Sequence, residues 1–200
     1  MKKPTIRRLI EFQKLLLKFS HIERVIHRTH PNQSDYTVEN DTEHSYNLAL
    51  TAWYLAGYFP ELDRDLVIRL ALVHDLVEIH AGDTYIYADE VTLASKVARE
   101  AKALIQLEQE WADFPDMTQH IKAYEHRSTP EAKFVYALDK IMPMMTIFIN
   151  DGYTWKQEDI TLTRLKSVKE SKVALSPEVI PYYNELCKIL EESPHLIPIK

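Results

Sequence analysis

Apolar residues recur at helical spacing along nearly the whole of this 200-residue chain. In the segment 5–19, for example, Leu9, Phe12, Leu16 and Phe19 return every three or four positions, which is typical of an amphipathic helix. Convincing alternation of apolar and polar residues at period two, the pattern of a half-buried strand, is found in no segment. The sequence therefore predicts an all-α fold.

Helix ends can be placed from caps and breakers. Thr129 precedes Pro130, whose missing N–H costs nothing in the first turn of a helix. Gly57, Gly82 and Gly152 each follow an amphipathic stretch, where a left-handed residue often ends a helix. The predicted helices cover about 5–19, 41–55, 63–81, 91–111, 117–126, 130–150, 157–172 and 176–192, with an irregular polar stretch at 27–40.

Length, charge and cysteine content restrict the class of protein. A chain of 200 residues favours a single domain, 1–200. The formal net charge of -6 argues against polymeric nucleic acid as a partner, but a small phosphorylated substrate needs only a local cationic site. Cys187 has no partner for a disulfide within the chain, which favours a reducing compartment. The N-terminus does not resemble a signal peptide and no apolar run is long enough to span a bilayer, so we expect a cytoplasmic protein that does not bind membranes.

Ionisable residues interrupt the apolar face of the predicted helix 63–81. His74 lies four residues after Leu70, inside the apolar stripe, and Glu78 lies four residues after His74 on the same face. Asp75 is adjacent. A lone histidine in such a stripe could be a hydrogen-bonded core residue. Three ionisable groups together are expensive to bury without partners, and a metal ion would satisfy all of them.

Two further residues complete a candidate metal site. His44 lies in the first turn of the predicted helix 41–55, although by itself it could be a solvated or capping residue. Asp139 lies in an apolar stretch where Lys140 could be its partner, and Pro143 cannot donate to its carbonyl, so the helix should kink or loosen there. Two histidines and two carboxylates suit one divalent ion such as Mn, Co, Ni, Fe or Zn, with positions left open for water and substrate.

The order of these residues resembles a known family. His44, then His74-Asp75, then Asp139 on successive predicted helices resemble the HD-domain superfamily of metal-dependent phosphohydrolases. Two segments of this chain look similar to the branch of that superfamily that contains the 5'-deoxynucleotidases. They are HDLVEIHAGDT at 74–84 and YALDKIMP at 136–143. The resemblance covers about 24–150. It implies an HD-type helical bundle whose metal-site core is that region, with the helices of 157–192 packing on it.

The resemblance implies a role for each matching residue. Glu78 would act as a general acid or base near the attacking water, and Asp83 would lie at the reaction site near the sugar and bear on the choice between ribose and deoxyribose. Arg24 is similar to the arginine that grips the phosphate, and Arg28 could assist it. From the residues alone, Arg24 could instead pair with a carboxylate such as Glu23, and Asp83 could be a turn residue. The metal ligands would be His44, His74, Asp75 and Asp139.

The implied activity is hydrolysis of phosphate from (deoxy)nucleoside 5'-monophosphates. One alternative on the same scaffold is a phosphodiesterase or a di-metal oxygenase, which would need further histidine ligands. His80, His120 and His126 are present, but His80 lies six residues past His74 and should point elsewhere. The other alternative is a non-catalytic nucleotide-binding HD module, although a pure binder has no need of Glu78.

The resemblance also favours a homodimer. The predicted helix 176–192 carries apolar residues that could pack on the domain or form a dimer face, among them Tyr182, Tyr183, Leu186 and Ile189.

Overall fold

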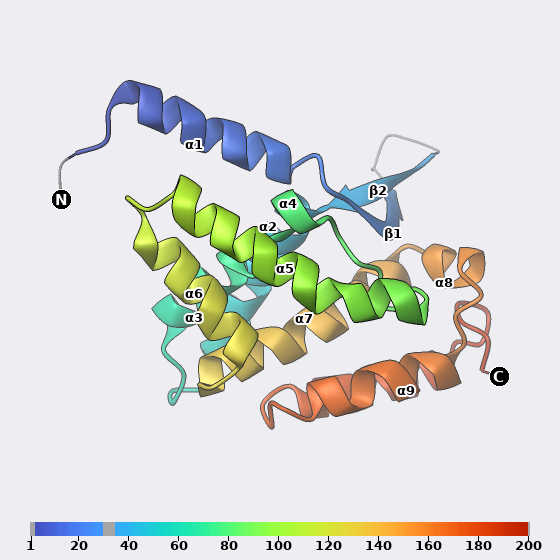
Figure 1. Cartoon of the computed structure of the whole chain (residues 1–200). Helices are drawn as coiled ribbons and strands as arrows, with labels where there is room; N and C mark the ends of the chain where they lie inside the picture. The colour runs from blue at the N-terminus through green and yellow to red at the C-terminus, as the bar shows by residue number, and fades with distance from the viewer. Residues whose placement is uncertain (1–2, 30–34, 200) are drawn as a thin grey trace.

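The computed structural model describes residues 3–29 and 35–199, and helix α7 (Pro130–Ile149) runs through its main hydrophobic core (Figure 1). The predicted start of this helix is observed, because the Thr129 side chain accepts a hydrogen bond from the Ala132 amide at 3.2 Å and Pro130 lies in the first turn. The helix continues through Pro143 without interruption. It contacts α2 (Asp41–Ala56), α3 (Arg64–Val73), α6 (Pro115–His126) and α9 (Leu162–Val173).

A second, smaller apolar cluster forms beside α1 (Ile6–Phe19). Leu15 and Phe19 of α1 pack there with Leu107 of α5 (Glu90–Glu110) and Ile121 of α6. The short helix α4 (Glu78–Ala81) contacts both α1 and α5 and lies between them in Figure 1. The two clusters together explain the helical periodicity of the sequence, and the predicted all-α class is confirmed.

The segment after α7 contributes to the main core. Trp155 of α8 (Tyr153–Gln157), Leu165 of α9 and Leu190 of α10 (Ile180–Glu191) belong to the same cluster as α7. The chain then returns to the start of α9, where the Leu162 amide donates to the Pro198 carbonyl at 2.7 Å. In the described part of the chain, 3–29 and 35–199, no helix combines the length and the apolar character needed to cross a bilayer.

The irregular stretch predicted at 27–40 is in part a hairpin. Strands β1 (Glu23–Thr29) and β2 (Tyr36–Asn40) pair antiparallel, with His27 opposite Val38 and a register irregularity between positions 23 and 27. The period-two signal is absent because Ile26 is the one residue of β1 that is fully buried, while its neighbours on both sides are half-buried. Residues 30–34, which fall within the predicted stretch, lie outside the described residues.

The single helix predicted at 63–81 is wrong, because the structure has α3 and α4 with a turn at 74–77 between them. In this turn the Leu76 amide donates to the Val73 carbonyl at 3.1 Å, and the Glu78 amide donates to the Asp75 carbonyl at 2.8 Å. These bonds span three residues instead of the four of an α-helix. Apolar periodicity continues across the turn, since Leu76 and Val77 are buried, and it therefore concealed the break.

Two smaller predictions also need correction. The helix predicted at 157–172 is instead α8 followed by α9, with Asp159 at a left-handed φ of 49° between them. Gly57 does not end α2 in a left-handed conformation, because its φ is -60°. The predicted left-handed region is observed at Gly152, whose φ of 66° allows the chain to turn from α7 into α8.

Candidate metal centre

The first ligand position is set by the junction between β2 and α2. The Asn40 side chain accepts a hydrogen bond from the Glu43 amide at 3.1 Å, and the Glu43 carboxylate accepts one from the Asn40 amide at 3.2 Å. This capping box fixes the first turn of α2. His44 follows it directly and is only 2% exposed. Its Nδ1 lies 3.6 Å from Oε2 of the buried Glu39, so its Nε2 is directed toward the interior of the site.

The second and third positions come from the turn at 74–77. His74 caps the end of α3, and its Nδ1 lies 2.9 Å from the carbonyl oxygen of Ala71, which accepts the proton if Nδ1 carries it. Nε2 is then free to act as a ligand. Because α3 ends at this point, the adjacent Asp75 is released from the helical rotation that would separate neighbouring side chains. Asp75 Oδ2 consequently lies 2.9 Å from His74 Nε2.

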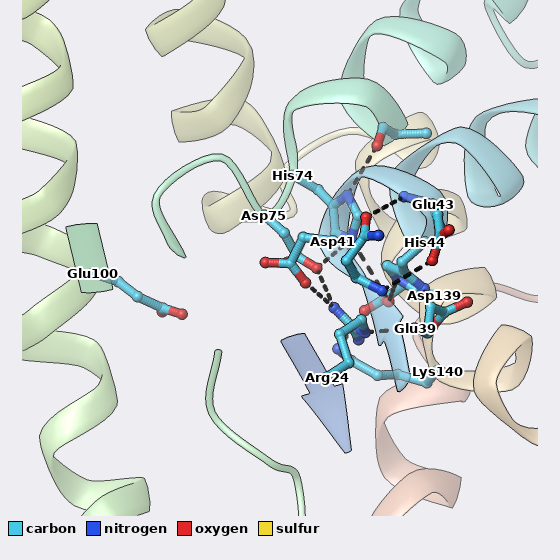
Figure 2. A network of polar contacts seen from close by, with 12 residues as sticks. Arg24, Glu39, Asp41, Glu43, His44, His74, Asp75, Glu100, Asp139 and Lys140 are labelled. Atoms are coloured by element: carbon cyan, nitrogen blue, oxygen red, sulfur yellow. Dashed lines mark hydrogen bonds and ion pairs between the residues drawn. The ribbon is translucent and has the colours of Figure 1, made fainter. Parts of the chain in front are cut away.

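The fourth position is supplied by the middle of α7. Asp139 Oδ1 lies 2.9 Å from His44 Nε2 and 3.7 Å from His74 Nε2, and Figure 2 shows these side chains converging from three separate elements. Lys140 also pairs with the Asp139 carboxylate, which is the alternative partner considered from the sequence. One candidate ligand atom from each of His44, His74, Asp75 and Asp139 lies within 4.8 Å of all the others.

These four residues fit a divalent metal ion. Ligands about 2.1 Å from one ion and at right angles around it lie about 3 Å apart, close to the separations in this cluster. His74 Nε2 is fully buried and makes no hydrogen bond, although a carboxylate oxygen is near. A bound cation would satisfy that nitrogen and neutralise the two carboxylates. The ligand set therefore could hold a metal ion, as the sequence predicts.

Groups of opposite charge lie close together in the cluster and shift one another's pKa values. Burial lowers the pKa of His74, but Asp75 and Asp139 outweigh it and raise the pKa to about 10. For Asp75, burial raises the pKa, whereas the charge of His74 lowers it, and the net result is well below the ordinary value. For Asp139, burial is likewise outweighed by Lys140 and the histidines. Both carboxylates are thus ionised and available as ligands.

Arg24 of β1 closes one side of the cluster. Its Nη1 donates to Asp41 Oδ1 and to Asp75 Oδ2, both at 2.9 Å, and its Nε lies 3.6 Å from Glu39 Oε2. The ion-pair reading of Arg24 thus applies, although with these three carboxylates instead of Glu23. Asp41, the first residue of α2, is fully buried beside the candidate metal cluster. No sequence signal indicated this burial, because the Asp41 carboxylate is paired with Arg24 of β1, an element that the sequence did not predict.

Glu78 lies next to Asp41 and Asp75 at the start of α4. It is 2% exposed, and burial followed by the charges of Asp75 and Asp41 raises its pKa well above the ordinary value. Candidate ligand atoms of these three carboxyl groups also lie within 4.8 Å of one another. Asp41 is affected in the same way, with burial and Asp75 raising its pKa to about 6. Burial and the neighbouring carboxylates therefore favour the protonated form of Glu78 more than in an ordinary glutamate, as suits a proton-transfer group.

The other candidate residues are divided between the cavity and the surface. A cavity of about 600 Å³ opens beside the cluster, and Arg24, Glu78 and Asp83 all line it. Burial raises the pKa of Asp83. Arg28 pairs with Glu43 and does not line this cavity. Sequence reasoning missed Lys169, a buried lysine of α9 in the cavity wall, because the segment after position 150 carried no motif.

The remaining histidines considered from the sequence lie away from the cluster. His80 Nε2 is 3.1 Å from Glu110 Oε2 on α5, as expected from its spacing. His120 and His126 are near carbonyl oxygens of their own helix α6, those of Asp116 and Lys122. Within the described residues, none of the three belongs to a group of candidate metal ligands.

Comparison with known proteins assigns the chain to a family. A family model described as the HD domain matches residues 22–180. The protein therefore belongs to the HD domain family. A relative from Bos taurus, named 5'-deoxynucleotidase HDDC2, is 33% identical over 138 residues, which is 67% of this chain and 63% of the relative. Its counterpart from Xenopus laevis is 32% identical over 66% of this chain and 64% of the relative. The chain thus spans slightly less than two thirds of these relatives.

A solved structure shows the same fold. A protein from Magnetospirillum magnetotacticum, described as a predicted metal-dependent phosphohydrolase, superposes with a TM-score of 0.76 and 30% sequence identity. The match covers 96% of this chain and 99% of that protein. The helical arrangement that brings His44, His74, Asp75 and Asp139 together thus has a counterpart in a solved structure.

Proposed function

We propose that this protein is a metal-dependent phosphohydrolase that releases phosphate from nucleoside 5'-monophosphates, with deoxyribonucleotides as the preferred class. The observation that carries the proposal is the convergence of two histidines and two aspartates at the edge of a cavity of about 600 Å³, which is within the usual size range of small-molecule sites. The names of the curated relatives support the nucleotide, and the solved structure supports the hydrolase class.

The metal ligands in this proposal are His44, His74, Asp75 and Asp139, and the ion is one of Mn, Co, Ni, Fe or Zn. When bound, such an ion supplies Lewis acidity, which lowers the pKa of water and polarises a phosphoryl oxygen. The protein supplies rigid ligands, because His44 follows a capping box and His74 is fixed through Ala71.

Glu78 is the proposed proton-transfer residue. Its raised pKa suits a proton exchange with the attacking water or the leaving oxygen. Asp83 follows Gly82, lines the same cavity and is proposed to contact the sugar. Tyr85 and Tyr87 continue along the wall, where a base can stack on an aromatic ring.

Arg24 is the proposed phosphate-orienting residue, because a guanidinium can present two parallel donors to phosphate oxygens. Its Nη1 is engaged by Asp41 and Asp75, so substrate binding must share or replace those contacts. Arg28 is a weaker proposal, since it pairs with Glu43 and lies outside the cavity lining.

The decisive assay starts with protein stripped of metal. Phosphate release is then measured for deoxyribo- and ribonucleoside 5'-monophosphates with Mn, Co, Mg or Zn restored. Metal-dependent release that favours deoxyribonucleotides supports the proposal. A protein that binds one ion and nucleotide but releases no phosphate would instead support the binding-module alternative. Two ions per chain would favour a di-metal enzyme.

We also infer a homodimer in the cytoplasm. The free, buried Cys187 suits a reducing compartment.

On the outer face of α2 and the turn after it, large apolar side chains remain exposed, and such a surface often marks an interface. Of the α10 residues considered for that role, Tyr183 and Leu186 are buried in the core. The exposed apolar residues on α2 and the turn after it are Tyr46, Leu50, Trp53, Tyr54 and Tyr58. Light scattering of the native protein and of Trp53→Glu tests this, with a monomeric native protein contradicting it.

A further inference from the structure

Lys169 is a lysine buried in the wall of the cavity. It lies on α9, lines the cavity beside Asp139 and Lys140, and is only 4% exposed. Lysine is almost never fully buried unless it is paired with an opposite charge. Its position therefore requires an explanation.

Among the described residues, Lys169 has a neutral hydrogen-bond acceptor but no paired carboxylate. Its Nζ donates to the carbonyl oxygen of Lys140 at 2.7 Å. Within residues 3–29 and 35–199, no ion pair at 4.0 Å or less includes this ammonium group. Burial first, and then the nearby charge of Lys140, lower the pKa of Lys169 to about 7. An anion that enters the cavity would oppose both effects, because its charge favours the ammonium form of the lysine.

The two cations that contact the cluster directly are already balanced. Arg24 faces the carboxylates of Asp41, Asp75 and Glu39, and Lys140 is paired with Asp139. The two-histidine, two-aspartate ligand set with a divalent ion would carry no net charge. A phosphate monoester that enters as a dianion therefore finds little uncompensated positive charge on these groups. Lys169, which lines the same cavity next to Lys140, supplies further positive charge there.

We propose that Lys169 binds the phosphate group of the substrate through its ammonium group and favours dianionic phosphate monoesters over singly charged diesters. This inference rests on the proposed phosphohydrolase function, since it assumes a phosphorylated ligand in the same cavity. It gives α9 a direct part in substrate selection.

A structural role is the competing explanation. Through the Lys140 carbonyl, Lys169 could serve only to fasten α9 to α7. Two variants separate the roles. Lys169→Gln keeps an N–H donor for that carbonyl and removes the charge, whereas Lys169→Met removes both. Lys166→Gln is the matched control, because Lys166 is on the same helix but pairs with Glu191 at the surface.

The first measurement is the affinity of the Mn-loaded 200-residue protein for inorganic phosphate, determined by calorimetry at pH 7. The second is the melting temperature of each variant. A charged hydrogen bond of ordinary strength corresponds to a loss of roughly tenfold or more in affinity. We expect that loss in both Lys169 variants, an unchanged Lys166→Gln protein, and no fall in melting temperature for Lys169→Gln. The proposal is overturned if a folded Lys169→Gln protein binds inorganic phosphate with unchanged affinity. It is also overturned if Lys169→Met has a lower melting temperature but the same affinity for inorganic phosphate as the native protein.

Kinetics distinguish this inference from the proposed function. If the native protein hydrolyses nucleotides, Lys169→Gln should raise the KM for a phosphate monoester by about the same factor as the loss in phosphate affinity. The variant should also prefer a monoester over a diester less strongly than the native protein does. Native turnover with an unchanged KM in the variant would leave the function standing and remove the inference. If the native protein shows no turnover but still binds inorganic phosphate through Lys169, the proposed hydrolase function fails and the phosphate-binding role of Lys169 stands.

Discussion

At the scale of single residues, the site contains carboxyl groups whose pKa values are shifted in opposite directions. Asp75 is next to His74 and Arg24, so its pKa is lowered, whereas Glu78 is close to two other carboxyl groups, and its pKa is raised by burial and by their charges. The same functional group is thus proposed to act as a ligand at one position and as a proton-transfer group at another.

The substitution Glu78→Gln tests this division. It keeps the shape of the side chain and the four metal ligands but cannot exchange a proton. We expect metal content equal to that of the native protein and a kcat lower by about 100-fold or more, the usual contribution of a positioned acid or base. Metal content is measured by elemental analysis and turnover by phosphate release. Native turnover in the variant would contradict the role.

The pH dependence of stability provides a second prediction at this scale. Burial and the charge of Lys140 lower the pKa of Lys169 from 10.5 to about 7, with Lys172 and Arg24 acting in the same direction and Asp139 against it. Between these two values the unfolded chain holds a proton that the folded protein has released. The free energy of unfolding therefore rises with pH across this interval.

The measurement compares native protein with Lys169→Met, both without metal. The melting temperature of the native protein should increase relative to that of the variant as the pH is raised from 7 to 10. Because other titrating groups are common to both proteins, the difference isolates this lysine. A difference that does not change with pH would mean that Lys169 keeps its ordinary pKa.

At the scale of elements, short connections position the functional side chains. The turn at 74–77 lets two consecutive residues face one ion, and Gly152 lets the chain reverse between α7 and α8. At Gly152 the space is closed as well, because an added Cβ would lie 2.1 Å from the carbonyl oxygen of Leu196. Since Leu196 is buried against this turn, the C-terminal segment is held there.

Replacing Gly152 with alanine should consequently destabilise the protein. A non-glycine residue at this positive φ costs about 1 kcal/mol or more, and displacement of the Leu196 backbone adds to it. Chemical denaturation measures the loss. Gly57→Ala is the control and should lose less stability, because Gly57 has a right-handed φ of -60° and an added Cβ there would lie 3.0 Å from the nearest backbone oxygen, that of Tyr54. Equal losses in the two variants would count against the close contact.

At the scale of the whole molecule, the metal centre joins elements distant in the sequence. The candidate ligands come from α2, the turn after α3 and α7, so a bound ion would connect three parts of the core (Figure 2). An ion that binds the folded chain but not the unfolded chain raises the free energy of unfolding by about 2.7 kcal/mol at 100 times its Kd. Metal binding should therefore be visible as thermal stabilisation.

The prediction compares native protein with Asp139→Ala and Glu100→Gln. Adding Mn or Co to stripped native protein should raise its melting temperature, and Asp139→Ala should abolish that rise. Glu100→Gln removes a carboxylate that lines the same cavity outside the ligand cluster, so its rise should match that of the native protein. A full metal-induced rise in Asp139→Ala would show that Asp139 is not a ligand.

The sequence by itself determined the helical class and most helix positions, because apolar periodicity and caps such as Thr129–Pro130 are local properties. The residues that form the candidate metal cluster could likewise be identified from sequence, since His74 and Asp139 interrupt apolar stretches and the order of His44, His74-Asp75 and Asp139 resembles the HD-domain pattern. The hairpin was missed because only Ile26 of β1 is buried, which leaves no alternation to detect.

Only the tertiary structure decided which groups surround the cluster. The turn at 74–77, the ion pairs of Arg24 and the burial of Asp41 and Lys169 arise from contacts between elements. Desolvation and charge proximity set the pKa and the binding capacity of a side chain, and both depend on packing that no local pattern encodes. For that reason a lysine of α9 outside every sequence motif became visible only when α9 was placed against α7.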